Sequence, residues 1–351
     1  MTPSQSRVDD DVLALLDPEK LSRWMDTQQL GETGRPVEPR LIVGGNQNAI
    51  FEVSRGDQRW ILRRPPRIVP PGRNESMERE FRVLQALAGS DVPHPEVHAL
   101  CTDQSVLGGT FYLMQAIDGW SYGVKDVWPA PYDSDLTARH HLAYELVGGI
   151  AKLRVVDWRA RGLEGFGRPE GFHERQVDRW YAHLEKFRFR DIPGLEVAGE
   201  WLRAHRPTDW TPGLMHGDYA FPNVLFSNDV PADLAAIVDW EMATIGDPLL
   251  DLAQLLMKWP EPGEQPDEAA MFDLTDMPSP GELVEHYERV SGRAVPDLTY
   301  YTILARFKLA IVLEGGYARY LAGETDNPKV AMYNDLILDA AAKAAELASA
   351  S

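Results

Sequence analysis

Three side chains between residues 216 and 241 have the types and the spacing needed to act together on a phosphate group. Asp218 lies five residues before Asn223, and Asp239 ends a short apolar run. A carboxylate beside an attacking hydroxyl can accept its proton, while a carboxamide and a second carboxylate offer the hard oxygen ligands that Mg²⁺ prefers. An Asp, an Asn at this spacing and a later Asp form an arrangement typical of phosphoryl transfer.

A β-hairpin is predicted to bring Asn223 and Asp239 to one place. Residues 224–226 and 234–238 are apolar, and a turn-rich segment separates them. Each motif alone also fits a chance tripeptide or a turn-forming Asp, but the two in this order predict a single site. Glu241, two residues further on, is an additional candidate for a contact to metal.

Segments spread along the chain resemble the aminoglycoside phosphotransferase superfamily, which consists of small-molecule kinases with a protein-kinase-like fold. That resemblance rests on residues 216–223, 239–241 and 246–253. A narrower likeness to the phosphotransferase domains associated with acyl-CoA dehydrogenases rests on residues 60–66, 79–84, 111–114, 175–180 and 316–320. The resemblance implies ATP and Mg²⁺ as cofactors, a small-molecule hydroxyl as acceptor, and a kinase that transfers the γ-phosphate.

The resemblance also implies an α+β, two-lobed fold, with a small antiparallel-sheet N-lobe and a larger, mostly helical C-lobe. We expect the N-lobe at residues 1–117, including an acidic lead-in at 1–16, and the C-lobe at 118–351. A chain of 351 residues is long enough for two lobes. Patterning predicts strands at 41–43, 49–53, 59–63 and 111–115, and helices at 17–29 and 77–87. Further helices are predicted at 136–155, 174–187, 249–259, 280–291, 300–321 and 329–348.

The turn between the first two predicted strands is a candidate loop over the nucleotide phosphates. It consists of Gly44, Gly45, Asn46, Gln47 and Asn48. Glycines let backbone N–H groups approach phosphate oxygens, although hairpins also use such turns routinely. The superfamily usually has Ser where this chain has Gln47, which leaves side-chain help with the β-phosphate open.

Arg63 occupies the position on the third strand where kinases usually keep a phosphate-binding lysine. Arginine preserves the charge and adds a bidentate geometry, and strand alternation sends Arg64 to the opposite face. Glu80, on the helix predicted at 77–87, is the expected ion-pair partner of Arg63. The alternative is that Glu80 is a solvated acid paired with Arg79 or Arg82.

Other roles follow from the resemblance alone. It implies that adenine binds to the Gln115 carbonyl and the Ile117 amide. It makes His216 a structural brace, and we expect Asp247 and Asp251 to cap and anchor the helix behind the metal loop. Arg154 stands where the superfamily tends to have His, and we have no physical account of that exchange.

Three hypotheses on the function remain open, and the first two differ in the acceptor. The narrower resemblance favours a hydroxyacyl-CoA whose phosphates meet Arg175 and Arg179, although these arginines also fit an ordinary solvated helix face. An aminoglycoside or other amino alcohol would instead need clustered carboxylates, here Glu261, Glu264, Asp267 and Glu268. A catalytically silent nucleotide-binding or acyl-CoA-binding pseudokinase is the third, and the presence of the complete motif set disfavours it.

The composition excludes some partners. A formal net charge of −19 argues against nucleic acid, which demands a basic surface. No apolar stretch approaches membrane-spanning length, and no basic segment followed by an apolar run indicates secretion. With a single cysteine, these features predict a cytoplasmic protein. Nothing in the sequence indicates the oligomeric state.

Overall fold

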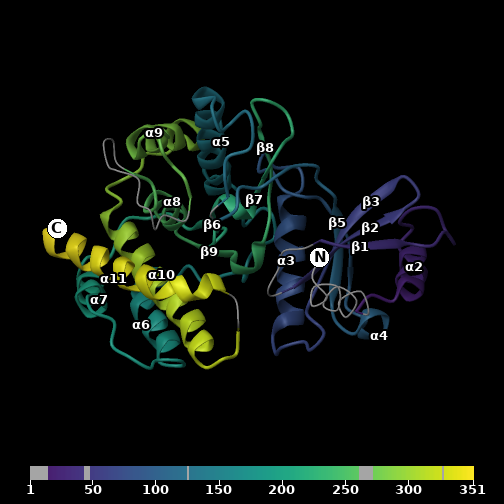
Figure 1. Cartoon of the computed structure of the whole chain (residues 1–351), viewed down its shortest axis with the longest axis horizontal. Coiled ribbons are helices and arrows are strands. Elements are labelled where there is room, and N and C mark those ends of the chain that lie inside the picture. Colours follow the sequence, from purple (N-terminus) through teal and green to yellow (C-terminus); the bar gives the residue numbers. More distant parts are fainter. Residues whose placement is uncertain (1–14, 43–47, 125, 261–271, 326–327) are drawn as a thin grey trace.

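The N-terminal part of the chain is built on one antiparallel sheet. The computed structural model describes residues 15–42, 48–124, 126–260, 272–325 and 328–351. Five strands pair in the order β1-β2-β3-β5-β4, and Figure 1 shows them gathered on one side of the molecule. Their bounds are β1 Glu38–Leu41, β2 Ala49–Arg55, β3 Gln58–Arg64, β4 Val97–Cys101 and β5 Phe111–Gln115.

The first strand begins earlier than the sequence predicts. We expected 41–43, but β1 runs from Glu38 to Leu41 and pairs Glu38 with Ser54. Because β1 lies at the edge of the sheet, it tolerates Pro39, which removes a backbone donor. The candidate phosphate loop at residues 43–47 lies outside the described residues, and Asn48 is buried next to the start of β2.

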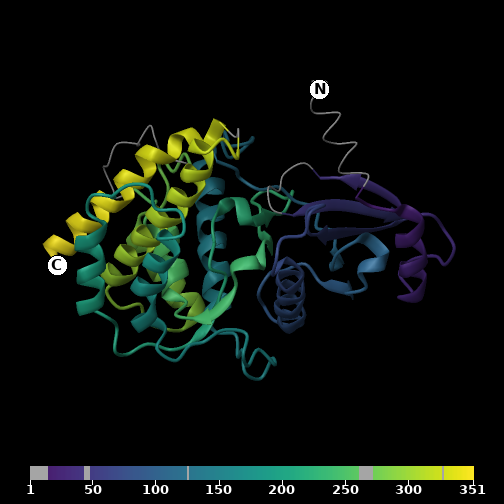
Figure 2. The same ribbon diagram turned by 90° about the horizontal axis from the view of Figure 1, so that it is seen from below.

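The sheet buries both faces by strict alternation. Phe111 and Leu113 pack with α2 (Pro18–Thr27), while Tyr112 and Met114 pack with α3 (Arg73–Leu87). Figure 2 shows α3 along one face of the sheet. Period-two patterning thereby separates the neighbouring arginines as predicted: Arg63 meets the α3 side, and Arg64 hydrogen-bonds the Leu15 carbonyl.

The rest of the chain is mainly helical. Figure 1 shows these helices on the side away from the sheet. Their bounds are α4 Gln104–Leu107, in the N-terminal part, then α5 Leu136–Arg154, α6 Phe172–Leu184, α7 Leu195–Ala204, α8 Leu249–Leu256, α9 Pro280–Ser291, α10 Thr299–Leu321 and α11 Tyr333–Ala350. The sequence did not predict β4, α4 or α7. It placed α9 correctly, where Ser279 and Glu282 form a capping box.

Two short antiparallel pairs lie between α7 and α8 along the chain. The pair β7 (Val224–Phe226) and β8 (Leu234–Ile237) is the predicted hairpin, and Val224 stands opposite Ile237. The pair β6 (Gly213–Met215) and β9 (Thr244–Gly246) encloses it in the sequence. Segments 216–223 and 238–243 are therefore both fixed at their ends by strand pairing. Among the described residues, no helix has the length and apolarity to span a bilayer.

Candidate active site

A buried carboxylate holds the loop that carries Asp218. Asp251 accepts hydrogen bonds from the backbone amides of His216 at 2.7 Å and Gly217 at 2.9 Å. Gly217 has a φ of +84°, and a Cβ there would lie 2.5 Å from the Met242 carbonyl oxygen. Glycine is thus required where the chain turns away from β6.

Asp247 and Asp251, which we expected to cap and anchor the helix behind the metal loop, act at α8 in different ways. Asp247 accepts from the amide of Leu249 at 3.1 Å, as a helix cap does, and also contacts His173 and Tyr301. Asp251 lies inside α8, where its carboxylate anchors the helix to the loop of Asp218. Burial raises the pKa of Asp251, and the hydrogen bonds from the backbone amides of His216 and Gly217 oppose that shift.

His216 connects the two halves of the site through backbone groups. Its Nε2 lies 2.9 Å from the Val238 carbonyl, and its Nδ1 accepts from the Asp218 amide at 3.3 Å. These contacts fit a neutral ring that donates from Nε2. The position of His216 is that of a brace between segments, in agreement with the prediction.

Asp218 is exposed, and two side-chain amides orient its carboxylate. Asn223 Nδ2 donates to Oδ2 at 3.1 Å, and Gln254 Nε2 donates to Oδ1 at 3.4 Å. Asn223 Nδ2 also donates to the Asp218 carbonyl at 2.7 Å. This directs the nitrogen of the Asn223 amide at Asp218 and leaves the amide oxygen on its other side for a different ligand.

The hairpin brings Asn223 and Asp239 together as predicted. The amide of Val238 donates to the Asn223 carbonyl at 2.9 Å, one residue before Asp239. Asp239 has a left-handed backbone with φ of +64°, and its side chain is 37% exposed. The strained turn at Asp239 therefore keeps a carboxylate open to solvent beside Asn223.

Arg63 joins the sheet to this end of the hairpin. Its Nε lies 2.8 Å from Glu80 Oε2, and its Nη2 lies 2.5 Å from Asp239 Oδ1. The predicted pairing with Glu80 is confirmed, so the alternative in which Glu80 is a solvated acid was wrong: Glu80 is 1% exposed and accepts a hydrogen bond from Tyr112. The contact to Asp239 was not foreseen.

The site around Arg63 contains more negative than positive charge. Glu241 lies 3.9 Å from Arg63 and 2.8 Å from Arg73, so three carboxylates share two guanidinium groups. Burial raises the pKa of Glu80 to about 7, against the charge of Arg63. Burial also acts against the charge on Arg63, but Glu80 and Asp239 outweigh it and raise the pKa of Arg63. Such a cluster favours a further cation.

Lys258 and Lys308 lie near Asp218, and the sequence did not indicate that they belong to the site. Lys308 donates to the Gly217 carbonyl at 2.6 Å and to Gln254 Oε1 at 3.0 Å. Burial lowers the pKa of both Lys258 and Lys308, and the charge of Asp218 opposes the shift in each case. They lie 40 and 90 residues beyond Asp218, without a local motif that could have identified them.

A small cavity opens beside Lys258. Its walls combine Gln254, which binds Asp218, with apolar and aromatic side chains. These include Phe221, Leu255, Trp259, Phe272 and Leu274. The Lys258 ammonium lies 5.8 Å from the centre of the Phe272 ring. The space next to Asp218 is therefore apolar in its walls and basic at its edge.

Gln115, Ile117, Arg175 and Arg179 are the other residues predicted to bind the nucleotide or the acceptor. Gln115 ends β5, where its backbone amide donates to the Glu96 carbonyl at 2.7 Å. Ile117 follows in the connection to the helical part. Arg175 is bound to the carbonyls of Arg168 and Glu170. Arg179 is exposed, and its positive charge helps burial to lower the pKa of Lys308.

Comparisons with known proteins agree with this geometry. The model of the phosphotransferase enzyme family matches residues 38–284. Acyl-CoA dehydrogenase family member 11 of Gallus gallus is 30% identical over 331 residues, which cover 90% of this chain but 41% of the relative. The chain therefore spans about two fifths of the length of that relative.

Solved structures share the fold. A Ralstonia eutropha protein provisionally named an aminoglycoside phosphotransferase is 28% identical, with a TM-score of 0.81 over 95% of this chain and 98% of that one. Spectinomycin phosphotransferase, solved with ADP and spectinomycin, has a TM-score of 0.58 at 10% identity over 94% and 98% of the two chains. From its family match and its site, this chain belongs to the phosphotransferase enzyme family and has a protein-kinase-like fold.

Proposed function

We propose that this phosphotransferase moves the γ-phosphate of ATP to the hydroxyl of an anionic small molecule, with Mg²⁺ as the metal. The observation that carries the proposal is the exposed Asp218, oriented by two amides beside Asn223 and Asp239. The donor set fits Mg²⁺, because a carboxamide oxygen and a carboxylate are hard ligands next to a cluster with excess negative charge. When bound, Mg²⁺ would neutralise charge on the phosphates.

Each residue of the proposed site has a separate role in this reaction. Asp218 accepts the proton of the acceptor hydroxyl as the oxygen attacks phosphorus. Asn223 and Asp239 would hold the metal, with Glu241 close by. Arg63, fixed by Glu80, supplies a guanidinium for the phosphates. Adenine would bind to backbone groups of Gln115 and Ile117, and the loop at residues 44–48 would cover the phosphates.

The charges beside Asp218 support an anionic acceptor over a polyamine. Lys258 and Lys308 are both close enough for their charges to interact with that of Asp218. Ammonium groups of an aminoglycoside would be repelled there, whereas phosphates or a carboxylate would be attracted. The carboxylates expected to bind an aminoglycoside, at 261–268, lie outside the described residues.

We favour a hydroxyacyl-CoA as this acceptor. Its CoA part carries phosphates, which the charges of Lys258 and Lys308 would attract. The chicken relative bears the name of an acyl-CoA dehydrogenase family member. Of the two arginines considered earlier, Arg179 is the better candidate for a phosphate contact, because backbone carbonyls already engage Arg175.

The test is ATP consumption by the purified chain with short-chain and medium-chain hydroxyacyl-CoAs and with kanamycin. We expect turnover of a hydroxyacyl-CoA, and we expect Lys258→Gln to raise its KM by roughly tenfold or more, as loss of a charge-assisted contact would. Lys343→Gln, on the exposed surface of α11, is the matched control. Turnover of kanamycin alone would reverse the choice of acceptor. Nucleotide binding without transfer to any acceptor would indicate a pseudokinase.

A further inference from the structure

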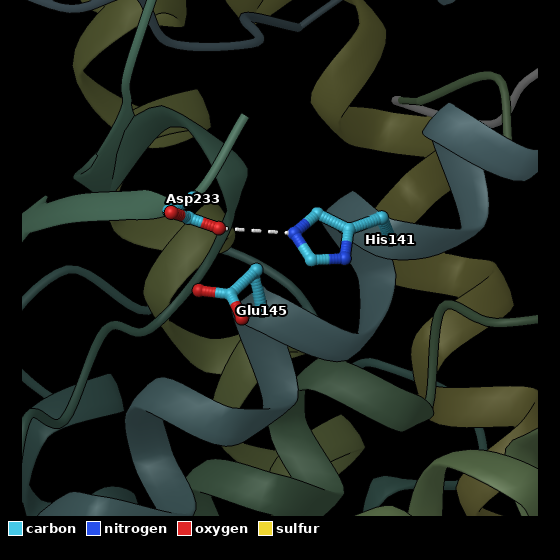
Figure 3. A group of neighbouring side chains, drawn as sticks. All are labelled: His141, Glu145 and Asp233. Carbon is cyan, nitrogen blue, oxygen red and sulfur yellow. Dashed lines mark hydrogen bonds and ion pairs between the residues drawn. The ribbon is translucent and has the colours of Figure 1, made fainter. Parts of the chain in front are cut away.

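A second group of potential metal ligands lies on the other end of the hairpin from Asp239. His141 and Glu145 occupy one face of α5, one helical turn apart, and Asp233 immediately precedes β8. Figure 3 shows His141 and Asp233 directed toward each other, with Glu145 beside them. One ligand atom from each lies within 4.8 Å of the others, and no other triad of this kind occurs among the described residues.

The spacing of these atoms is close to that around a bound ion. His141 Nε2 lies 3.1 Å from Asp233 Oδ1. Two ligand atoms held at roughly 2.0–2.1 Å on a tetrahedral Zn²⁺ would lie about 3.3 Å apart. His141 and Asp233 therefore need little movement, and the Glu145 ligand atom lies within 4.8 Å of theirs.

Backbone contacts orient two of the three ligands. The amide of Leu234 donates to Glu145 Oε2 at 3.0 Å, which aims the carboxylate at the hairpin. Asp233 is held by Ser227, whose Oγ accepts from the Asp233 amide at 3.2 Å and whose amide donates to the Asp233 carbonyl at 2.9 Å. Contacts of this kind position ligating carboxylates in metal sites and preserve their geometry.

We propose that His141, Glu145 and Asp233 bind one Zn²⁺, with water completing the coordination. One imidazole and two carboxylates are a donor set that suits Zn²⁺, whereas Mg²⁺ favours an all-oxygen shell. The proposed ion is thus separate from the Mg²⁺ assigned to Asn223 and Asp239, and this proposal does not depend on the identity of the acceptor.

A bound Zn²⁺ would link α5 to the hairpin. Asp233 and Asp239 stand six residues apart at opposite ends of β8, about 20 Å along an extended strand. Binding of Zn²⁺ would tie the turn of the hairpin to α5 without reaching Asp218. We therefore expect an effect on stability and a far smaller effect on the rate of phosphate transfer.

The experiment titrates the metal-stripped protein with Zn²⁺ at pH 7.5 and follows binding by calorimetry and unfolding by a thermal scan. We expect one Zn²⁺ per chain and a rise in Tm of about 3–5 °C at a hundredfold excess over Kd. His141→Ala and Asp233→Asn should each weaken binding by roughly tenfold or more. A tenfold excess of Mg²⁺ should not displace the ion.

The matched control is His140→Ala. His140 neighbours His141 on α5 but contacts the Asp276 carbonyl, so its removal should leave Zn²⁺ affinity unchanged. Asp239→Ala should also leave it unchanged. The proposal is overturned if wild-type protein binds no Zn²⁺, or if His141→Ala binds it as wild type does while Asp239→Ala does not.

Discussion

Replacing Arg63 by Met separates its structural role from its role toward nucleotide. Arg63 is 6% exposed and provides the cation for Glu80, which is 1% exposed, and for Asp239. Met fills similar space without charge. The substitution therefore leaves a carboxylate buried without its cation, and removes the guanidinium that we assign to the phosphates.

The size of the effect follows from the burial of Glu80. Removing one partner of a buried ion pair costs roughly 3–5 kcal/mol. Glu80 has a pKa of about 7 and can take up a proton, which limits the loss. We expect Arg63→Met to lower the free energy of unfolding by about 3 kcal/mol near pH 7, with a larger loss at higher pH. ATP affinity should fall roughly tenfold to a hundredfold, the value of one charge-assisted contact.

Urea unfolding and calorimetric ATP binding measure the two effects separately, and a second substitution distinguishes them. When Arg63→Met is combined with Glu80→Gln, the buried charge is gone, and the new amide oxygen can still accept the hydrogen bond from Tyr112. Stability should return toward the wild-type value while ATP affinity stays low. Wild-type ATP affinity in the double variant would refute the phosphate role, and wild-type stability in Arg63→Met would refute the energetic reasoning.

Three further outcomes are expected. Asp218→Asn should lower kcat by ~10²–10⁴-fold with ADP affinity unchanged, because it removes the proton acceptor; near-normal turnover would eliminate Asp218 as the base. Asp239→Ala should raise the Mg²⁺ concentration needed for half-maximal activity, and an unaltered Mg²⁺ titration would exclude it as a ligand. The third outcome concerns pH and is measured in EDTA. Because burial raises the pKa of Glu80 from 4.5 to about 7, the folded protein keeps a proton in this window that the unfolded chain has lost. The free energy of unfolding should therefore fall as pH rises through this window, by up to about 3 kcal/mol, and Glu80→Gln should flatten the slope; an equal slope in both proteins would contradict the raised pKa.

The parts of the site that depend on local geometry could be predicted from the sequence. The short hairpin places Asn223 and Asp239 together because strand pairing fixes the ends of any such turn. Period-two alternation predicted which of Arg63 and Arg64 faces α3. Asp218 follows from its fixed spacing to Asn223. In each case the relevant residues are near in sequence, or a simple period relates them.

The distant side chains that complete the site could not be predicted from the sequence, because the packing of the helices selects them. Arg63 and Asp239 are 176 residues apart, and Lys308 reaches the Gly217 carbonyl across 91 residues. Asp251 was expected to cap and anchor a helix, and the docking of α8 makes the loop of Asp218 the partner of its carboxylate. His141 meets Asp233 only where α5 packs against the hairpin. Such contacts depend on how helices pack and rotate against one another, and no local pattern of residues encodes that.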